Sequence, residues 1–210
     1  SLQTTLTVVL ITALVGMAAG ADGIAGYGTG SRLEYLLVPL VFGIGGPLLA
    51  MVGTCIGAGQ RERALRATWV GAALAFGLAE TIGIAAALFP RAWLSLFDSD
   101  PAMIEAGAQY LRIVGPFYGF FGLGLVLYFA SQGAGRLLWP VLGNAARLVV
   151  AAGVGWLALR LSGNLALVFA AQGAAMVVYG LVNAWSIAGG AWFGRPGWPR
   201  SPAVLAARYS

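Results

Sequence analysis

The sequence predicts an all-α membrane protein, and its composition carries that prediction. Hydrophobic residues make up 60% of the 210 residues and charged residues only 9%, whereas a soluble domain usually carries about 25% charged residues. A water-soluble globule of this length could not bury so much apolar surface, so the solvent is predicted to be a bilayer. The 32 glycines agree, because small residues let membrane helices approach one another closely.

Six apolar stretches are long enough, at about 20 residues, to cross a bilayer as helices. Their approximate ranges are 2–20, 32–56, 65–88, 104–130, 138–159 and 165–189. They lack the alternation of apolar and polar residues that membrane β-strands show. Residues 1–192 are therefore predicted to form one unit of six transmembrane helices, and residues 193–210 to form a tail.

The charges of the short links predict the orientation of the helices. Arginines gather in the second link, the fourth link and the tail, whereas most acids lie in the other links. The arginines are Arg61, Arg63, Arg66, Arg136, Arg195, Arg200 and Arg208, and the acids are Asp22, Glu34, Asp98, Asp100 and Glu105. Arginine in short loops marks the cytoplasmic side of a membrane. Both chain ends, and the tail, are therefore predicted to be cytoplasmic. A lipid-headgroup site at the arginine-rich second link is the alternative interpretation of that cluster.

The composition also excludes several kinds of chemistry. The sequence has no histidine and no lysine, so histidine bases, histidine metal ligands, Schiff-base lysines and P-loops are absent. Its one cysteine, Cys55, lies in an apolar run and is predicted to be a small packing residue. The positive charge falls in loops rather than along one face, so no nucleic-acid partner is predicted. The chain is not expected to be an enzyme.

The start of the fourth helix carries a local capping signal. In the stretch "DSDPAM", Ser99 or Asp100 is predicted to be the N-cap, and Pro101 stands at the first helical position, where proline is favoured. Capping is therefore preferred to an ion site as the role of Asp98 and Asp100.

Polar residues within or near the apolar stretches are the candidate functional residues. Glu80 and Arg147 interrupt the third and fifth stretches, where an unpaired charge costs at least about 2.5 kcal/mol near the bilayer centre. Each is therefore predicted to be neutralised, paired or water-facing, and a pair between the two is preferred to a direct role in transport. Glu34, near Arg32 and Tyr35, is predicted to make a headgroup-level or inter-helix polar contact. Four further residues could line a cavity or form inter-helix hydrogen bonds: Gln3, Tyr118, Tyr128 and Gln132.

Three long stretches together resemble one family of transporters. The first is "GIAGYGTGSRLEYLLVPLVFGIGGPLLAMVGTCIGAGQRERA", the second is "LFPRAWLSLFDSDPAMIEAGAQYLRI" and the third is "YFASQGAGRLLWPVLGNAARL". In this order they are similar to the seventh and eighth helices, the ninth-to-tenth link and the tenth-to-eleventh link of the multidrug and toxic compound extrusion (MATE) transporters. The resemblance runs from about residue 1 to residue 192.

The resemblance implies a MATE/MOP-type fold of twelve helices in two lobes, of which this chain matches the C-terminal lobe of six transmembrane helices. It implies an inner-membrane antiporter that couples export of cationic amphipathic compounds to inward flow of H⁺ or Na⁺. The partner would be an N-terminal lobe, and Ser1 is expected to be the edge of a longer chain. Some branches of the family carry acids in the first and fourth helices of this lobe. The matching stretches here, "SLQTTLTVVL" and "PFYGFFGLGLVLYF", hold none, so the coupling ion is expected in the N-terminal lobe, and no other cofactor is expected.

Two alternatives stay open. Lipid-linked oligosaccharide flippases and the lipid II flippase share the superfamily fold, but their cavities are typically rich in cationic side chains, whereas this chain is mostly apolar. A structural six-helix membrane subunit without transport activity is the alternative from another class.

Overall fold

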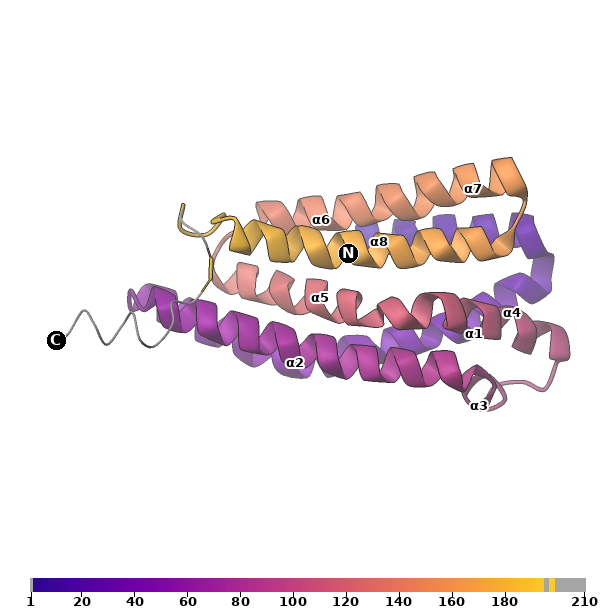
Figure 1. The fold of residues 1–210 in the computed structure, drawn as a ribbon, viewed down its shortest axis with the longest axis horizontal. Coiled ribbons are helices and arrows are strands. Elements are labelled where there is room, and N and C mark those ends of the chain that lie inside the picture. The colour runs from indigo at the N-terminus through magenta and orange to yellow at the C-terminus, as the bar shows by residue number, and fades with distance from the viewer. Residues whose placement is uncertain (1, 195–196, 199–210) are drawn as a thin grey trace.

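The computed structural model describes residues 2–194 and 197–198, and every regular element in these ranges is helical (Figure 1). The elements, in chain order, are α1 (Leu2–Gly57), α2 (Arg61–Leu88), α3 (Pro90–Leu94), α4 (Pro101–Val114), the 3-10 turn η1 (Gly115–Phe117), α5 (Tyr118–Gly133), α6 (Leu138–Val149), the π-helical turn η2 (Val150–Val154), α7 (Gly155–Ser162) and α8 (Leu165–Ala188). The prediction of an all-α membrane fold is confirmed. By length and composition, five continuous helical paths could cross a membrane within the described residues.

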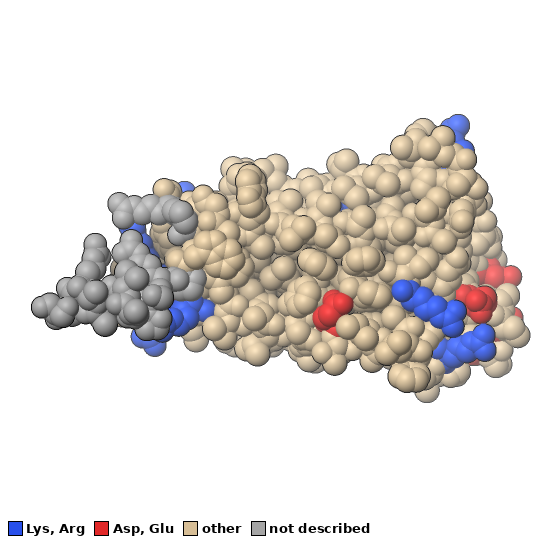
Figure 2. All heavy atoms as spheres, viewed as in Figure 1, with Lys and Arg blue, Asp and Glu red and all other residues tan. Residues whose placement is uncertain are grey.

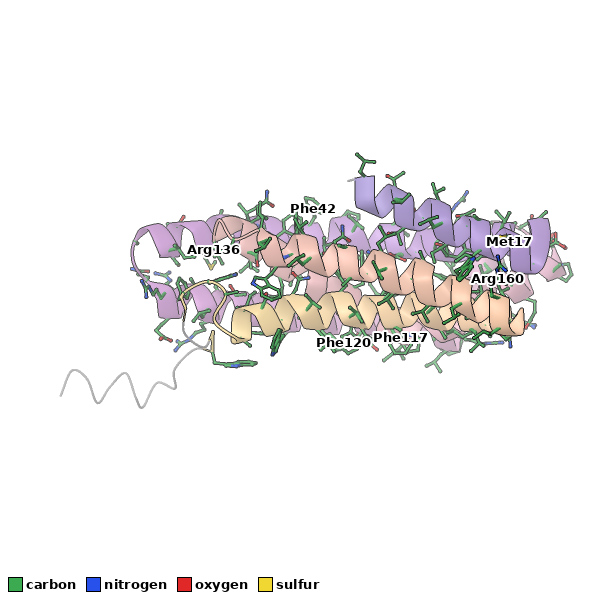
Figure 3. The ribbon with its side chains drawn as sticks, turned by 90° about the horizontal axis from the view of Figure 1, so that it is seen from above. Met17, Phe42, Phe117, Phe120, Arg136 and Arg160 are labelled. Carbon is green, nitrogen blue, oxygen red and sulfur yellow. The ribbon has the colours of Figure 1, made fainter. Side chains whose placement is uncertain are left out.

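The long helices lie side by side along the long axis of the molecule (Figure 1). Helix α5 packs against α1 and α2 on one side and against α8 on the other, and α8 in turn packs against α6 and α7. The helices at the front of the bundle in Figure 1 follow the order α2, α5, α8, and then the continuous path of α6 and α7. Helix α1 lies behind them. Arg136 and Arg160 lie at opposite ends of the bundle (Figure 3), as expected if α6, η2 and α7 form one membrane crossing.

The first path, α1, contains two antiparallel segments. The chain reverses at Gly20, whose φ of 64° and ψ of −151° belong to a region that is essentially open only to glycine. Residues before Gly20 run toward the end of the bundle where α7 meets α8, and the later residues run back toward the opposite end (Figures 1 and 3).

The expectation that residues 21–31 form a link between the first two helices is wrong, because these residues are helical. The single glycine at position 20 makes the reversal, so a longer link is unnecessary. The glycines that suggested a link instead permit close packing. A Cβ atom on Gly26 would lie 2.7 Å from the carbonyl oxygen of Met103, and one on Gly30 would lie 2.7 Å from the ring of Tyr110.

Two local predictions are confirmed. The side chain of Asp100 accepts hydrogen bonds from the backbone amides of Ala102 and Met103 at 3.4 and 3.3 Å, so Asp100 is the N-cap of α4. Pro101 occupies the first turn. Cys55 is buried in an apolar cluster that also contains Val52 and Leu65.

The charged residues lie mainly at the two ends of the bundle. Figure 2 shows blue atoms near both ends, red atoms near one of them, and a broad band of mostly uncharged residues between the ends. Large apolar side chains are exposed along this band, including Leu74, Val149 and Trp185. A surface of this kind is stable in hydrocarbon and unfavourable in water, so the chain is a multi-pass membrane protein.

A seam of small residues joins α2 to the bent path formed by α4, η1 and α5. A Cβ atom on Gly83 would overlap with the carbonyl oxygen of Gly115, and one on Gly122 would lie 2.8 Å from the carbonyl oxygen of Ala75. Backbones can approach this closely only where side chains are missing, which is how membrane helices gain packing contacts.

Candidate functional site

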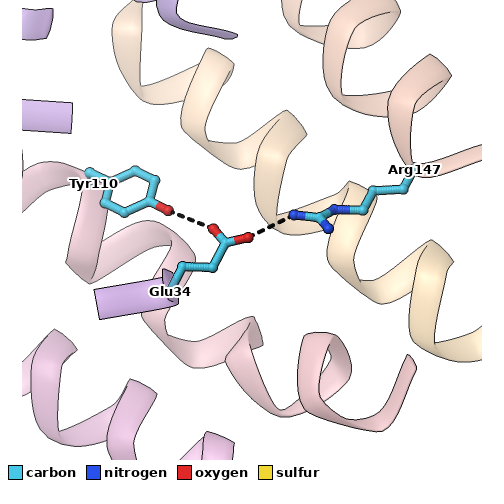
Figure 4. Close-up of polar contacts among 3 residues, drawn as sticks. All are labelled: Glu34, Tyr110 and Arg147. Atoms are coloured by element: carbon cyan, nitrogen blue, oxygen red, sulfur yellow. Dashed lines mark hydrogen bonds and ion pairs between the residues drawn. The ribbon is translucent and has the colours of Figure 1, made fainter. Parts of the chain in front are cut away.

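A buried ion pair lies inside the bundle, between helices that are far apart in the chain. Nη2 of Arg147 lies 2.7 Å from Oε1 of Glu34, and the hydroxyl of Tyr110 donates a hydrogen bond to the other carboxylate oxygen at 3.3 Å (Figure 4). The exposed fractions of the two charged side chains are 8% for Arg147 and 15% for Glu34. We refer to Glu34, Tyr110 and Arg147 as the Glu34 cluster.

Each member of the Glu34 cluster comes from a different helix. Glu34 lies on the second segment of α1, Tyr110 lies on α4 and Arg147 lies near the end of α6. Tyr110 belongs to the buried face of α4, which also contains Met103, Gly107, Leu111 and Val114. Arg147 stands three residues before Val150, the first residue of the π-helical turn, and such turns are frequent at functional sites. The cluster therefore ties together three helices that meet only through tertiary folding.

Aromatic rings surround the guanidinium group of Arg147. Its central carbon lies 5.0 Å from the ring centre of Phe121 and 5.8 Å from that of Tyr179, within the range of cation–π attraction. Nε of Arg147 is buried and has no hydrogen-bond partner among the described residues. Arg147 thus depends on one carboxylate and two rings to offset the loss of water.

A second aromatic group packs beside Tyr110. The rings of Tyr27 and Tyr110 meet edge to face with their centres 5.2 Å apart, and Phe169 contacts Tyr110 in the same manner at 5.2 Å. Close packing of the Tyr110 ring therefore holds its hydroxyl in place, and this hydroxyl donates a hydrogen bond to Glu34. These contacts fix the carboxylate of Glu34 on both of its oxygens.

The predicted pair between Glu80 and Arg147 is wrong. Glu80 instead accepts a hydrogen bond from the backbone amide of Gly119 at 2.8 Å, and Arg147 pairs with Glu34. The reason is the order of the helices, since α5 and α8 lie between α2 and α6. The predicted inter-helix polar contact of Glu34 is confirmed.

The other predicted candidates are spread over the molecule. The guanidinium of Arg32 lies 5.1 Å from the ring centre of Phe97, and Tyr35 is exposed. Tyr118 is fully buried, the ring of Tyr128 packs against Phe129, and Gln132 is exposed near the end of α5. The side chain of Gln3 lies outside the described residues. None of these five described residues makes a hydrogen bond or ion pair with Glu34 or Arg147 within the described part of the chain.

The residues that sequence reasoning missed are mainly aromatic: Tyr27, Tyr110, Phe121, Phe169 and Tyr179. The burial of Tyr110 could have been predicted from the sequence, because Tyr110 is spaced from the other residues of the buried face of α4 as residues on one side of a helix are. The remaining rings lie in stretches that are apolar on every side of the helix, where periodicity does not distinguish one face from another.

The arrangement holds an ion pair inside an apolar bundle. No group of three or more histidine, cysteine, aspartate or glutamate side chains that could hold a metal ion occurs within the described ranges. A buried, paired acid within membrane-spanning helices is typical of transporters and ion pathways. The fold and the site thus define a helical membrane protein of the transporter class.

Comparison with known proteins places the chain in a family. The sequence profile of the MatE family matches residues 1–157, which is most of the chain, and the chain belongs to this family. The probable multidrug resistance protein NorM of Thermotoga maritima is 32% identical over 136 residues, which cover 65% of this chain and 29% of that protein. The FAD transporter of Shewanella oneidensis is 27% identical over 139 residues, which cover 65% of this chain and 31% of that protein.

Solved structures agree on the fold. A MOP superfamily transporter from Pyrococcus furiosus superposes with a TM-score of 0.80 at 19% identity, covering 87% of this chain and 41% of that one. The MATE transporter ClbM in complex with Rb⁺ superposes with a TM-score of 0.80 at 22% identity, covering 98% of this chain and 45% of that one. The chain thus has the fold of part of a MATE transporter and spans less than half the length of these relatives.

Proposed function

We propose that this chain is the C-terminal half of a secondary multidrug transporter, which exports cationic amphipathic compounds in exchange for H⁺ or Na⁺ by alternating access. The observation that carries the proposal is the superposition of nearly the whole chain on less than half of a MATE transporter. Transporters of this kind are commonly built from repeats with the substrate site between them. In this proposal residues 1–192 form one lobe and residues 193–210 form a cytoplasmic tail.

The partner in this proposal is a second six-helix lobe, and both lobes lie in the inner membrane with the ends of this chain in the cytoplasm. The arginines near the start of α2 (Arg61, Arg63 and Arg66) and Arg136 in the α5–α6 link support this orientation. Because Glu34 is already paired with Arg147, the ion pair of this lobe is not a vacant cation site, which supports an ion-coupling carboxylate in the other lobe.

The proposal is tested by transport in vesicles. The 210-residue chain is reconstituted alone, and in parallel together with the six-helix lobe that precedes it in its gene or, failing that, with the corresponding lobe of a MATE relative. Uptake of a cationic dye is followed under a proton or sodium gradient. Gradient-driven transport only when both lobes are present is expected. Strong transport by the chain alone would contradict the two-lobe proposal and would favour a homodimer.

A second candidate substrate follows from the similarity to the FAD transporter. FAD is an anionic dinucleotide, so it differs in charge from the proposed cationic compounds. Flavin export that competes with dye transport in the same vesicles would favour this candidate. No transport of either compound by the two-lobe protein would favour the structural subunit or the lipid-linked oligosaccharide flippase.

A further inference from the structure

Glu80 is an isolated acid within a membrane-spanning helix. The nearest acids along the chain are Glu62 and Asp98, and Glu80 lies about 12 Å from the end of α2 at Leu88, at 1.5 Å per residue. Its side chain is partly exposed at the surface of the bundle. An acid at such a position is a candidate for function.

The carboxylate of Glu80 occupies the start of a neighbouring helix. Oε2 accepts the amide hydrogen of Gly119 at 2.8 Å, and Gly119 is the second residue of α5. The 3-10 turn that contains Pro116 separates α5 from α4, and the amide of Tyr118 donates to the carbonyl oxygen of Gly115 in the 3-10 manner. The start of a helix needs acceptors from outside the regular helical pattern, and Glu80 supplies one to the next amide. The N-cap residue Phe117 supplies no side-chain hydrogen bond. Glu80 therefore does from α2 what an N-cap side chain usually does within its own helix.

The surrounding residues are shaped for this contact. A Cβ atom on Gly119 would overlap with Oε2 of Glu80 and would lie 2.9 Å from the ring of Phe76. Phe76 also meets Phe120 edge to face, with the ring centres 5.3 Å apart. The carboxylate thus reaches the backbone of α5 through a gap that only glycine leaves open, beside an apolar contact.

Among the described residues, no opposite charge is paired with the carboxylate of Glu80. The elements packed against α2 carry other charged or titratable groups, which include Glu34 of α1, Tyr110 and Arg112 of α4, and Tyr118 of α5. None of them forms an ion pair or hydrogen bond with Glu80 within the described residues. The amide of Gly119 and the partial positive charge at the start of α5 are the groups that favour the ionised form, whereas the apolar surroundings oppose it.

We propose that Glu80 is a proton-binding site that links the protonation of this lobe to the bend between α4 and α5. The ionised carboxylate fixes the start of α5 against α2. When the carboxylate takes a proton from a hydronium ion in the adjoining water, one O–H bond of hydronium breaks and one O–H bond of the carboxylic acid forms, which leaves a neutral water molecule. The charge of the side chain changes from −1 to zero, and the attraction to the start of α5 weakens. Helix α5 can then turn relative to α4 about the 3-10 turn. A use of this step in export, in addition to the coupling carboxylate proposed for the other lobe, rests on the proposed function, but the step itself does not.

The first test measures the bend. Spin labels are attached at positions 102 and 132, on exposed sites of α4 and α5, in a Cys55→Ala protein in lipid nanodiscs. The distance between the labels is measured by pulsed electron resonance at mildly alkaline and mildly acidic pH. We expect the distance to change with pH in the parent protein. Glu80→Gln, which keeps the acceptor oxygen but is always neutral, should show the acidic-pH distance at both values.

The second test detects the proton. Infrared difference spectra between the two pH values should contain a carbonyl band of a protonated carboxylic acid, and Glu80→Gln should remove it. Asp22→Asn is the matched control, because Asp22 is an exposed acid of α1, and it should keep both the band and the distance change. Gly119→Ala should displace the carboxylate from α5, so the band should remain while the distance change is lost.

Several results would overturn the inference. They are a distance change in Glu80→Gln equal to that of the parent protein, the same carbonyl band in Glu80→Gln, or the absence of both signals from the parent protein. Neither measurement uses a transported compound. A failure of transport in vesicles would therefore count against the proposed function alone.

Discussion

Glu34 and Arg147 are separated by 113 positions in the chain, yet a carboxylate oxygen of one lies 2.7 Å from a guanidinium nitrogen of the other. The pair joins the second segment of α1 to α6 across the interior of the bundle. Desolvation of two ions offsets much of their attraction, so the pair is expected to specify how these helices meet more than to add net stability.

Removal of one partner should be more harmful than removal of both. Glu34→Gln or Arg147→Gln leaves one buried charge unpaired, and each should destabilise the protein by about 3–5 kcal/mol. The double variant should recover much of this loss, with a coupling of about 0.5–3 kcal/mol. Thermal unfolding of the four proteins in detergent measures the cycle. Additive losses would show that the two side chains do not interact.

The hydroxyl of Tyr110 should contribute a smaller amount. Tyr110→Phe keeps the ring contacts with Tyr27 and Phe169 but removes the hydrogen bond to Glu34, and the expected loss is about 1–2 kcal/mol. Tyr128→Phe is the control, because the ring of Tyr128 packs against Phe129 outside the Glu34 cluster. Equal unfolding temperatures for the two variants would refute a role for the Tyr110 hydroxyl.

The seam between α2 and η1 should not tolerate even one methyl group. Gly83→Ala places a Cβ atom against the carbonyl oxygen of Gly115, so the helices must separate and the protein should lose about 1–3 kcal/mol. Gly77→Ala is the matched control on the same helix, since nothing lies within 4 Å of its added Cβ. This control should unfold at the same temperature or higher, because alanine favours helix. A loss in Gly77→Ala as large as that in Gly83→Ala would argue against the close approach.

The orientation of the bundle can be read with single cysteines in a Cys55→Ala protein. Ser99 and Gln60 are both exposed. Gln60 lies in the link before α2, and Ser99 lies in the link that follows α3. A membrane-impermeant thiol reagent added to intact cells should label a cysteine at position 99 and spare one at position 60. The reverse pattern would invert the proposed topology.

Local patterns in the sequence predicted much of the fold, because membrane helices are specified by runs of apolar residues and helix starts by short signals. Asp100 and Pro101 are such a signal, and the structure confirms it. The partner of Arg147 could not be predicted in the same way. The choice between Glu34 and Glu80 depends on the lateral order of α2, α5, α8 and α6, which hydropathy does not encode.

Glycine-rich stretches were ambiguous for a physical reason. A glycine can open a turn, as Gly20 does, or admit a neighbouring backbone, as Gly26 does. The sequence alone does not distinguish these two roles of glycine. The stretch from residue 21 to residue 31 was therefore predicted to be a link, although it is a helical surface that packs against α4.

The reversal at Gly20 also constrains how the chain enters the membrane during synthesis. Its two antiparallel segments are joined by a single non-helical residue. Neither segment can therefore reach its final depth in the bilayer before the other segment has entered the bilayer. The two segments would enter the bilayer together as a helical hairpin. The residues around Gly20 would cross the hydrocarbon in that single step. A foreign epitope placed between Gly20 and Ala21 should therefore block insertion of both segments together, whereas the same epitope after Gly59, in the exposed turn before α2, should leave insertion intact.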